Sequence, residues 1–187
     1  MQWQSLTQPV LGLAMAAAAL TGVSAHAGQV TLDVSGIFSN AEFGDASNET
    51  RFVSLFTGAH ITGIAFDVTL STNPATLSWL SDIGVDIGDG SGAGGHFYPG
   101  GGDNSVGSGS YAGSFDLLSS GDDFVVGASG GLTFQFFEFF DDAPGWDGVW
   151  ERGSLTVTYV PEPASYGLAA LALLGAGFAS RRRSGAA

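Results

Sequence analysis

The sequence contains no cysteine and no lysine, and both absences restrict what this chain can be. Without cysteine it forms no disulfide and offers no thiol nucleophile or thiolate metal ligand. Without lysine, its permanent cations are five arginines, three of them near the C-terminus. Eighteen acidic residues leave a net charge of −13, and an acidic surface repels nucleic acid and anionic lipid. We therefore expect no nucleic-acid partner.

The C-terminal segment combines three features that soluble domains rarely carry. A Pro-Glu-Pro triplet precedes an uncharged run, residues 164–179, and an arginine cluster follows. At about 1.5 Å per helical residue this run spans roughly 24 Å, and snorkelling arginines extend it toward the thickness of a membrane. Arginines favour the cytoplasmic side, which places the rest of the chain outside. The residues concerned are Pro161, Glu162, Pro163, Arg181, Arg182 and Arg183.

This C-terminus resembles the PEP-CTERM sorting signal of Gram-negative bacteria. The resemblance implies export across the inner membrane, transient anchoring there, and recognition of the triplet by exosortase, an integral-membrane cysteine protease or transpeptidase. It also implies a final location at the cell surface or in the extracellular matrix. A permanent C-terminal anchor without processing is the alternative interpretation of the same residues.

The N-terminus predicts export independently. Residues 10–23 are apolar and rich in alanine, and Ala25 and Ala27 supply the small side chains that signal peptidase requires, which predicts cleavage before Gly28. The segment ahead of them departs from the usual pattern because it contains no arginine or lysine. We therefore expect a signal peptide at 1–27, a domain at 28–159 and a sorting signal at 160–187.

The region between these terminal segments has the pattern of an all-β domain. Stretches rich in β-branched and aromatic residues, most of them alternating in polarity, are separated by turn formers. This pattern predicts seven or eight strands in an antiparallel β-sandwich or jelly roll, with helices only in the signal peptide and the membrane tail. The expected strands are residues 29–34, 51–56, 61–70, 83–87, 114–118, 132–139 and 154–160. Residues 88–109 contain ten glycines, and we expect a long surface loop there.

Two stretches resemble the P-domain jelly roll that accompanies subtilisin-like proprotein convertases. Residues 61–70 with 78–85 are similar to a strand, a loop and the next strand of that fold, and residues 131–157 are similar to its closing hairpin. The resemblance covers about half of the domain. It implies a jelly roll whose acidic turns order loops and sometimes hold calcium, and it carries over no enzymatic activity.

The domain does not contain the residue patterns of common hydrolases. A Gly-x-Ser-x-Gly elbow between a strand and a helix is missing, and His60 and His96 stand alone, without zinc-site spacing. Carboxylates are abundant, so a secreted polysaccharide hydrolase with two acids across a cleft is the alternative hypothesis. We expect a non-enzymatic component of the cell surface or extracellular matrix without a resident cofactor.

Acidic turns make calcium the first candidate ligand of the domain. Calcium takes six to eight oxygen ligands, and turns rich in Asp and Gly offer carboxylates together with free carbonyls. The candidate residues are Asp141, Asp142 and Asp147, which flank a Pro-Gly turn. Neither an EF-hand loop nor a calcium-binding nonapeptide repeat is present, so a solvated acidic surface is the alternative interpretation.

Aromatic residues make carbohydrate the second candidate ligand. Trp146, Trp150 and Tyr98 are predicted to line a groove where their rings stack on sugars, with extracellular polysaccharide as the ligand. Alternation over residues 134–140 places Phe134, Phe136 and Phe140 on one strand face with Glu138, and Gln135, Phe137 and Phe139 on the other. Packing of these aromatic rings in the core is the alternative interpretation.

Overall fold

The computed structural model describes residues 26–141 and 145–161, and the structural statements below concern these residues. They form ten strands and one short helix. The elements are β1 (Gly28–Asp33), β2 (Ile37–Ser39), β3 (Thr50–Ser54), β4 (Ala59–Thr72), β5 (Ile83–Gly88), β6 (Gly94–Phe97), β7 (Ser108–Asp116), α1 (Leu117–Ser120), β8 (Phe124–Val125), β9 (Gly131–Glu138) and β10 (Gly148–Pro161).

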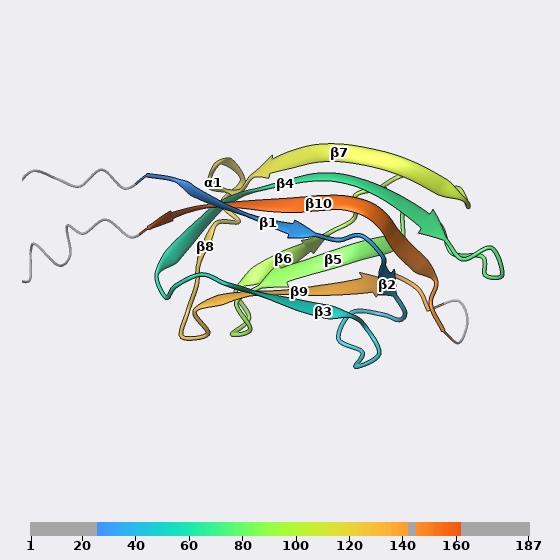
Figure 1. Ribbon diagram of the computed structural model, residues 1–187, viewed down its shortest axis with the longest axis horizontal. Helices are drawn as coiled ribbons and strands as arrows, with labels where there is room; N and C mark the ends of the chain where they lie inside the picture. Colours follow the sequence, from blue (N-terminus) through green and yellow to red (C-terminus); the bar gives the residue numbers. More distant parts are fainter. Residues whose placement is uncertain (1–25, 142–144, 162–187) are drawn as a thin grey trace, which may run out of the picture. The chain divides into compact units, whose positions relative to one another are not determined.

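The strands form two antiparallel sheets (Figure 1). The larger sheet has the order β1-β10-β4-β7. The short strand β2 pairs with the first residues of β10, and β8 pairs with the first residues of β4. The smaller sheet has the order β3-β9-β5-β6. The predicted all-β antiparallel class is confirmed, and each expected strand overlaps an observed one.

A single hydrophobic core joins the two sheets. The larger sheet contributes residues such as Leu155 and Val157, and the smaller sheet contributes residues such as Val85 and Phe134. The rings of Phe136 on β9 and Trp150 on β10 meet edge to face across the interface at 5.1 Å. Burial of each such side chain stabilises the fold by about 1.5–3 kcal/mol, so the facing of β9 and β10 is a main source of stability.

The glycine-rich stretch 88–109 is not one long loop, contrary to the prediction. It contains β6, which pairs with β5, and the first residues of β7. Gly94 explains why the sequence of β6 lacks the alternation of side chains that predicts a strand. Its φ is +135°, and a Cβ there would overlap the Ile87 carbonyl. Only glycine allows this approach of two backbones, so the strand carries no side-chain pattern at that position.

Among the residues that the structure describes, no helix is long and apolar enough to cross a membrane. The predicted signal helix and the predicted C-terminal membrane helix fall in residues 1–25 and 162–187, which lie outside the described residues.

Candidate functional site

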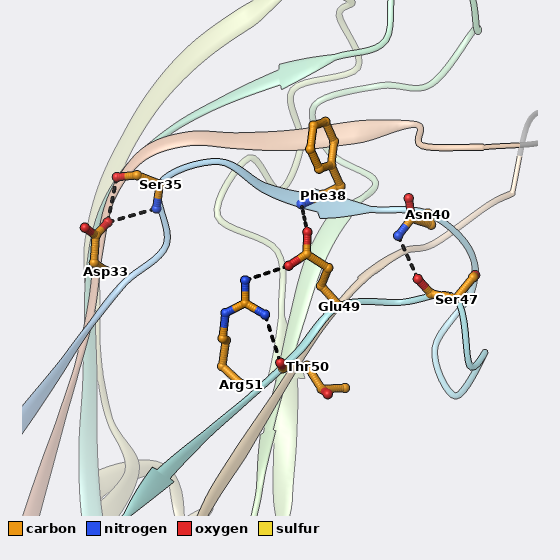
Figure 2. Close-up of polar contacts among 8 residues, drawn as sticks. All are labelled: Asp33, Ser35, Phe38, Asn40, Ser47, Glu49, Thr50 and Arg51. Carbon is orange, nitrogen blue, oxygen red and sulfur yellow. Dashed lines mark hydrogen bonds and ion pairs between the residues drawn. The ribbon is translucent and has the colours of Figure 1, made fainter.

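The loop between β2 and β3 crosses from the larger sheet to the smaller one and is fixed by polar contacts. The Glu49 carboxylate accepts hydrogen bonds from the Phe38 backbone N–H at 3.1 Å and from the Arg51 guanidinium at 2.7 Å (Figure 2). Further along, the Asn40 side chain donates to the Ser47 carbonyl at 2.8 Å. These contacts anchor both ends of the loop.

The same loop runs alongside β9. The backbone N–H of Glu138 donates to the Ala41 carbonyl at 2.8 Å, and that of Gly44 donates to Gln135 Oε1 at 2.9 Å. The loop therefore continues, beyond the end of β3, the hydrogen bonding along this edge of β9. This course brings Phe43 over the outer face of the smaller sheet.

Six aromatic side chains meet on that outer face, and we call this cluster the aromatic face. Phe137 is its centre, with three rings at centroid distances of 5.4, 5.6 and 5.7 Å. The contacts continue from Tyr98 to Phe139 at 6.0 Å and from Phe139 to Phe140 at 4.6 Å. The members are Phe43, His96, Tyr98, Phe137, Phe139 and Phe140.

Much of the aromatic face is open to solvent. Phe43, Phe139 and Phe140 are each more than half exposed, and Phe137 is buried beneath them. Gly84 of β5 makes room for this packing, because a Cβ there would lie 2.8 Å from Tyr98 and 2.9 Å from Phe137. Contiguous exposed aromatic rings are uncommon on monomeric proteins and mark interaction sites.

A polar row borders the aromatic face. Asp86 of β5 lies opposite both His96 on β6 and Gln135 on β9. Burial raises the pKa of Asp86, and the neighbouring His96 acts in the opposite direction. Burial also raises the pKa of Tyr98, so its hydroxyl remains a hydrogen-bond donor at neutral pH. The face therefore combines flat apolar rings with hydrogen-bonding groups at its rim.

A hollow of about 470 Å³ adjoins the aromatic face at Phe43. Three acidic residues line it, Glu42, Asp45 and Asp141. The backbone N–H and the hydroxyl of Ser47 donate to Asp45 and lower its pKa. This carboxylate is therefore an acceptor, and its environment does not favour a proton-donating acid.

The second region of interest is the end of the larger sheet where β10 stops. Gly28, the first residue of β1, pairs there with Tyr159, and Pro161 at the end of β10 pairs with Ala59 of β4. The start of β1 and the end of β10 therefore lie at the same end of the larger sheet (Figure 1). The triplet predicted to be recognised begins within the last strand.

Comparison with protein families decides what this C-terminus is. A model described as the PEP-CTERM protein-sorting motif matches residues 160–183. The chain carries a PEP-CTERM motif. The resemblance predicted from the sequence is confirmed, and the motif supports an exported protein that is targeted to exosortase through a membrane-anchored C-terminal signal. No curated protein matches the chain.

The structure covers only the first residues of the PEP-CTERM motif. Pro161 closes β10, whereas Glu162, Pro163 and the cluster Arg181, Arg182 and Arg183 lie outside the described residues. At the other terminus, Ala25 also lies outside them. Ala27 is exposed just ahead of β1, so the predicted cleavage before Gly28 would leave the strand whole. That cleavage stays a prediction.

Four acidic turns share one sequence, Asp-x-Ser, and one geometry. In each, one carboxylate oxygen of the Asp accepts hydrogen bonds from the backbone N–H and the hydroxyl of the Ser two residues later. These bonds lower the pKa of all four Asp carboxyls. The turns are Asp33–Ser35, Asp45–Ser47, Asp89–Ser91 and Asp103–Ser105. These carboxylates therefore hold the backbone of turns, a role that the repeated Asp-x-Ser spacing signals in the sequence.

The predicted calcium ligands are covered only in part. Asp142 lies outside the described residues, Asp141 is exposed and Asp147 is fully buried. Within residues 26–141 and 145–161, no three His, Cys, Asp or Glu side chains gather so that they could hold a metal ion. Calcium binding at these three residues stays a prediction.

The three predicted sugar-binding aromatics lie in different environments. Trp150 is fully buried in the core, where its indole N–H donates to the Ser39 hydroxyl at 3.3 Å, so its prediction as a surface ring is wrong. Trp146 is half-buried, with its ring 5.4 Å from that of Phe38. Tyr98 belongs to the aromatic face. Its partners Phe137 and Phe139 come from a distant part of the chain, which alternation within one strand could not reveal.

Proposed function

We propose that this protein is a non-enzymatic component of the cell surface or extracellular matrix that binds neutral polysaccharide through the aromatic face. The PEP-CTERM motif supports delivery to that location. The observation that carries the ligand class is the aromatic face itself, where exposed rings adjoin a polar row. The C–H groups of sugar rings pack on aromatic rings, and sugar hydroxyls hydrogen-bond to polar side chains at the rim.

The charge of the domain selects among polysaccharides. Residues 28–159 contain seventeen acidic residues and two arginines, Arg51 and Arg152. Arg51 is engaged with Glu49. An anionic polysaccharide would therefore meet like charge on approach, whereas a neutral polymer would not. We accordingly infer that the ligand is uncharged.

Replacing both Phe139 and Phe140 by alanine is expected to weaken binding of neutral polysaccharide by about fivefold to a hundredfold. Each ring contributes about 0.5–1.5 kcal/mol when stacked, and 1.4 kcal/mol corresponds to a tenfold change. Affinity electrophoresis of the mature protein in gels that contain dextran, galactomannan or soluble cellulose derivatives measures the loss.

The matched control replaces Phe52 and Phe115, which are also exposed but lie outside the aromatic face. This double variant should bind as the wild type does. No retardation of the wild type by any neutral polymer would contradict the proposal, as would equal losses in the two double variants.

The hollow beside Phe43 supports a second candidate function, a polysaccharide hydrolase. Its carboxylates adjoin the aromatic face, which is where two acids would have to act on a bound chain. The pKa of Asp45 is lowered, so Asp45 does not suit the proton-donating acid of a glycosidase, and that role would fall to another carboxyl group. We favour the non-enzymatic role because exposed aromatic rings are the main feature of this surface. Release of reducing sugar ends by the wild type, and its loss in Glu42→Gln, would establish the hydrolase instead.

A further inference from the structure

The PEP-CTERM motif and the folded domain share residues. The motif begins at residue 160, and β10 ends at Pro161. Val160 pairs with His60 of β4, and Pro161 pairs with Ala59. No linker therefore separates the sheet from the triplet that exosortase recognises.

Chain geometry limits how far the enzyme can stay from the domain. A residue advances the chain by at most about 3.6 Å, so Glu162 and Pro163 reach no more than about 7 Å beyond Pro161. An enzyme that holds the triplet in its active site must therefore come within van der Waals distance of the end of the sheet. This constraint follows from the described end of β10 and the position of the motif alone.

Two exposed apolar side chains lie at the end of the larger sheet where β10 stops, and we call the surface there the exit surface. Phe56 is 41% exposed and its ring lies 5.7 Å from that of Tyr159, the residue just ahead of the motif. Val125 of β8 is 44% exposed and pairs with His60. The exit surface comprises Phe56, His60, Asp123, Val125 and Tyr159.

The charge of the exit surface favours a protein over a lipid partner. His60 lies 2.6 Å from the Asp123 carboxylate, and the surface includes no arginine or lysine. A bilayer with anionic lipids is attracted by basic side chains, which the exit surface does not offer. Exposed apolar side chains next to a carboxylate instead suit a protein partner with apolar and basic groups.

We propose that exosortase contacts the folded domain itself, at the exit surface, while it processes the PEP-CTERM motif. This inference rests on processing of the motif by exosortase. The exit surface then contributes to substrate recognition beyond the triplet, and processing depends on both the fold and the sorting signal.

The first test is photocrosslinking in cells that express the full chain. Phe56 is replaced by the photoreactive residue p-benzoylphenylalanine. In the control, p-benzoylphenylalanine replaces Val106 instead. Val106 is more exposed than Phe56. It lies beside Gly107, whose backbone N–H donates a hydrogen bond to Thr72, at the end of β4 opposite to the exit surface. We expect an adduct with exosortase from position 56 only. Adducts with lipid alone, or none, overturn the proposal.

The second test compares Val125→Asp with the matched change Val106→Asp. We expect Val125→Asp to slow conversion of precursor to processed protein at least tenfold and Val106→Asp to leave the rate unchanged. Circular dichroism and melting temperature establish that both variants fold. Unchanged processing of folded Val125→Asp contradicts the proposal.

A spacer variant separates contact from other effects. A flexible Gly-Ser segment followed by a second Val-Pro pair is inserted between Pro161 and Glu162, which keeps both β10 and the motif whole. In this chain Val125→Asp should no longer slow processing, because the enzyme works away from the exit surface. An equal loss with the spacer overturns the proposal. If the wild-type chain is never processed, the premise that exosortase processes the motif is itself wrong. Failure of the premise is thereby distinguished from failure of the proposed contact.

Discussion

Deletion of Pro161, Glu162 and Pro163 is expected to leave the protein in the inner membrane at precursor size. We expect processing to require the triplet, and the deletion leaves the uncharged run and the arginines that follow it in place. With the anchor intact and the recognition sequence gone, release should fall to the background level. Fractionation of the cells, followed by detection of the domain in membrane, surface and medium, measures the effect.

The deletion should not disturb the fold. Pro161 is the last residue of β10 and has no backbone N–H to donate to the sheet. A matched control replaces an exposed proline and an exposed glutamate elsewhere, as Pro74→Ala with Glu151→Gln. This control should be processed as the wild type is. Unchanged release after the deletion would refute processing at the triplet and favour a different signal.

The sorting motif could be predicted from sequence because its information is local. The triplet, the uncharged run and the arginines follow one another, so no tertiary structure is needed to recognise them. The strands were predictable for a similar reason, since alternation is a property of neighbouring residues. β6 was missed because its glycines carry no side chains to alternate.

The aromatic face could be predicted only in part because it is assembled from distant segments. Alternation correctly placed Phe137 opposite to Phe134 and Phe136. It placed Phe140 on the face of Phe134 and Phe136, whereas β9 ends at Glu138 and Phe140 is exposed beside Phe139. Pairing of β5 with both β6 and β9 brings His96 and Tyr98 to Phe137, and the β2–β3 loop brings Phe43 there. No local pattern encodes these contacts.

The acidic turns show that composition alone does not assign a role to a carboxylate. Calcium binding at Asp141, Asp142 and Asp147 stays a prediction, whereas four other aspartates follow the Asp-x-Ser spacing and accept hydrogen bonds within their own turn. Among these, Asp89 differs because it is buried and reaches a second segment. Its carboxylate accepts hydrogen bonds from Ser91, from the Ala93 N–H at 3.3 Å and from the Gly127 N–H at 3.0 Å. It therefore ties the β5–β6 turn to the segment that precedes β9.

Asp89→Ala is expected to reduce the free energy of unfolding by about 3 kcal/mol. The substitution removes a buried carboxylate that accepts hydrogen bonds from several N–H groups, and hydrogen bonds to charged groups contribute about 1.5–3 kcal/mol. Denaturant unfolding at pH 7 measures the change. Asp45→Ala is the matched control, since Asp45 makes the same Asp-x-Ser turn on the surface, and its effect should be much smaller.

The effect of Asp89→Ala should also depend on pH in a definite direction. Hydrogen bonds from Ser91, followed by those from Gly127 and Ala93, lower the pKa of Asp89 in the folded protein. A lowered pKa stabilises the fold above the unfolded-state value of about 3.9, and this stabilisation is lost as pH falls through the folded value. The difference between wild type and Asp89→Ala should therefore be constant from pH 5 to 7 and shrink below pH 4. A difference that persists unchanged into strong acid would show that the ionised carboxylate is not what holds the two segments together.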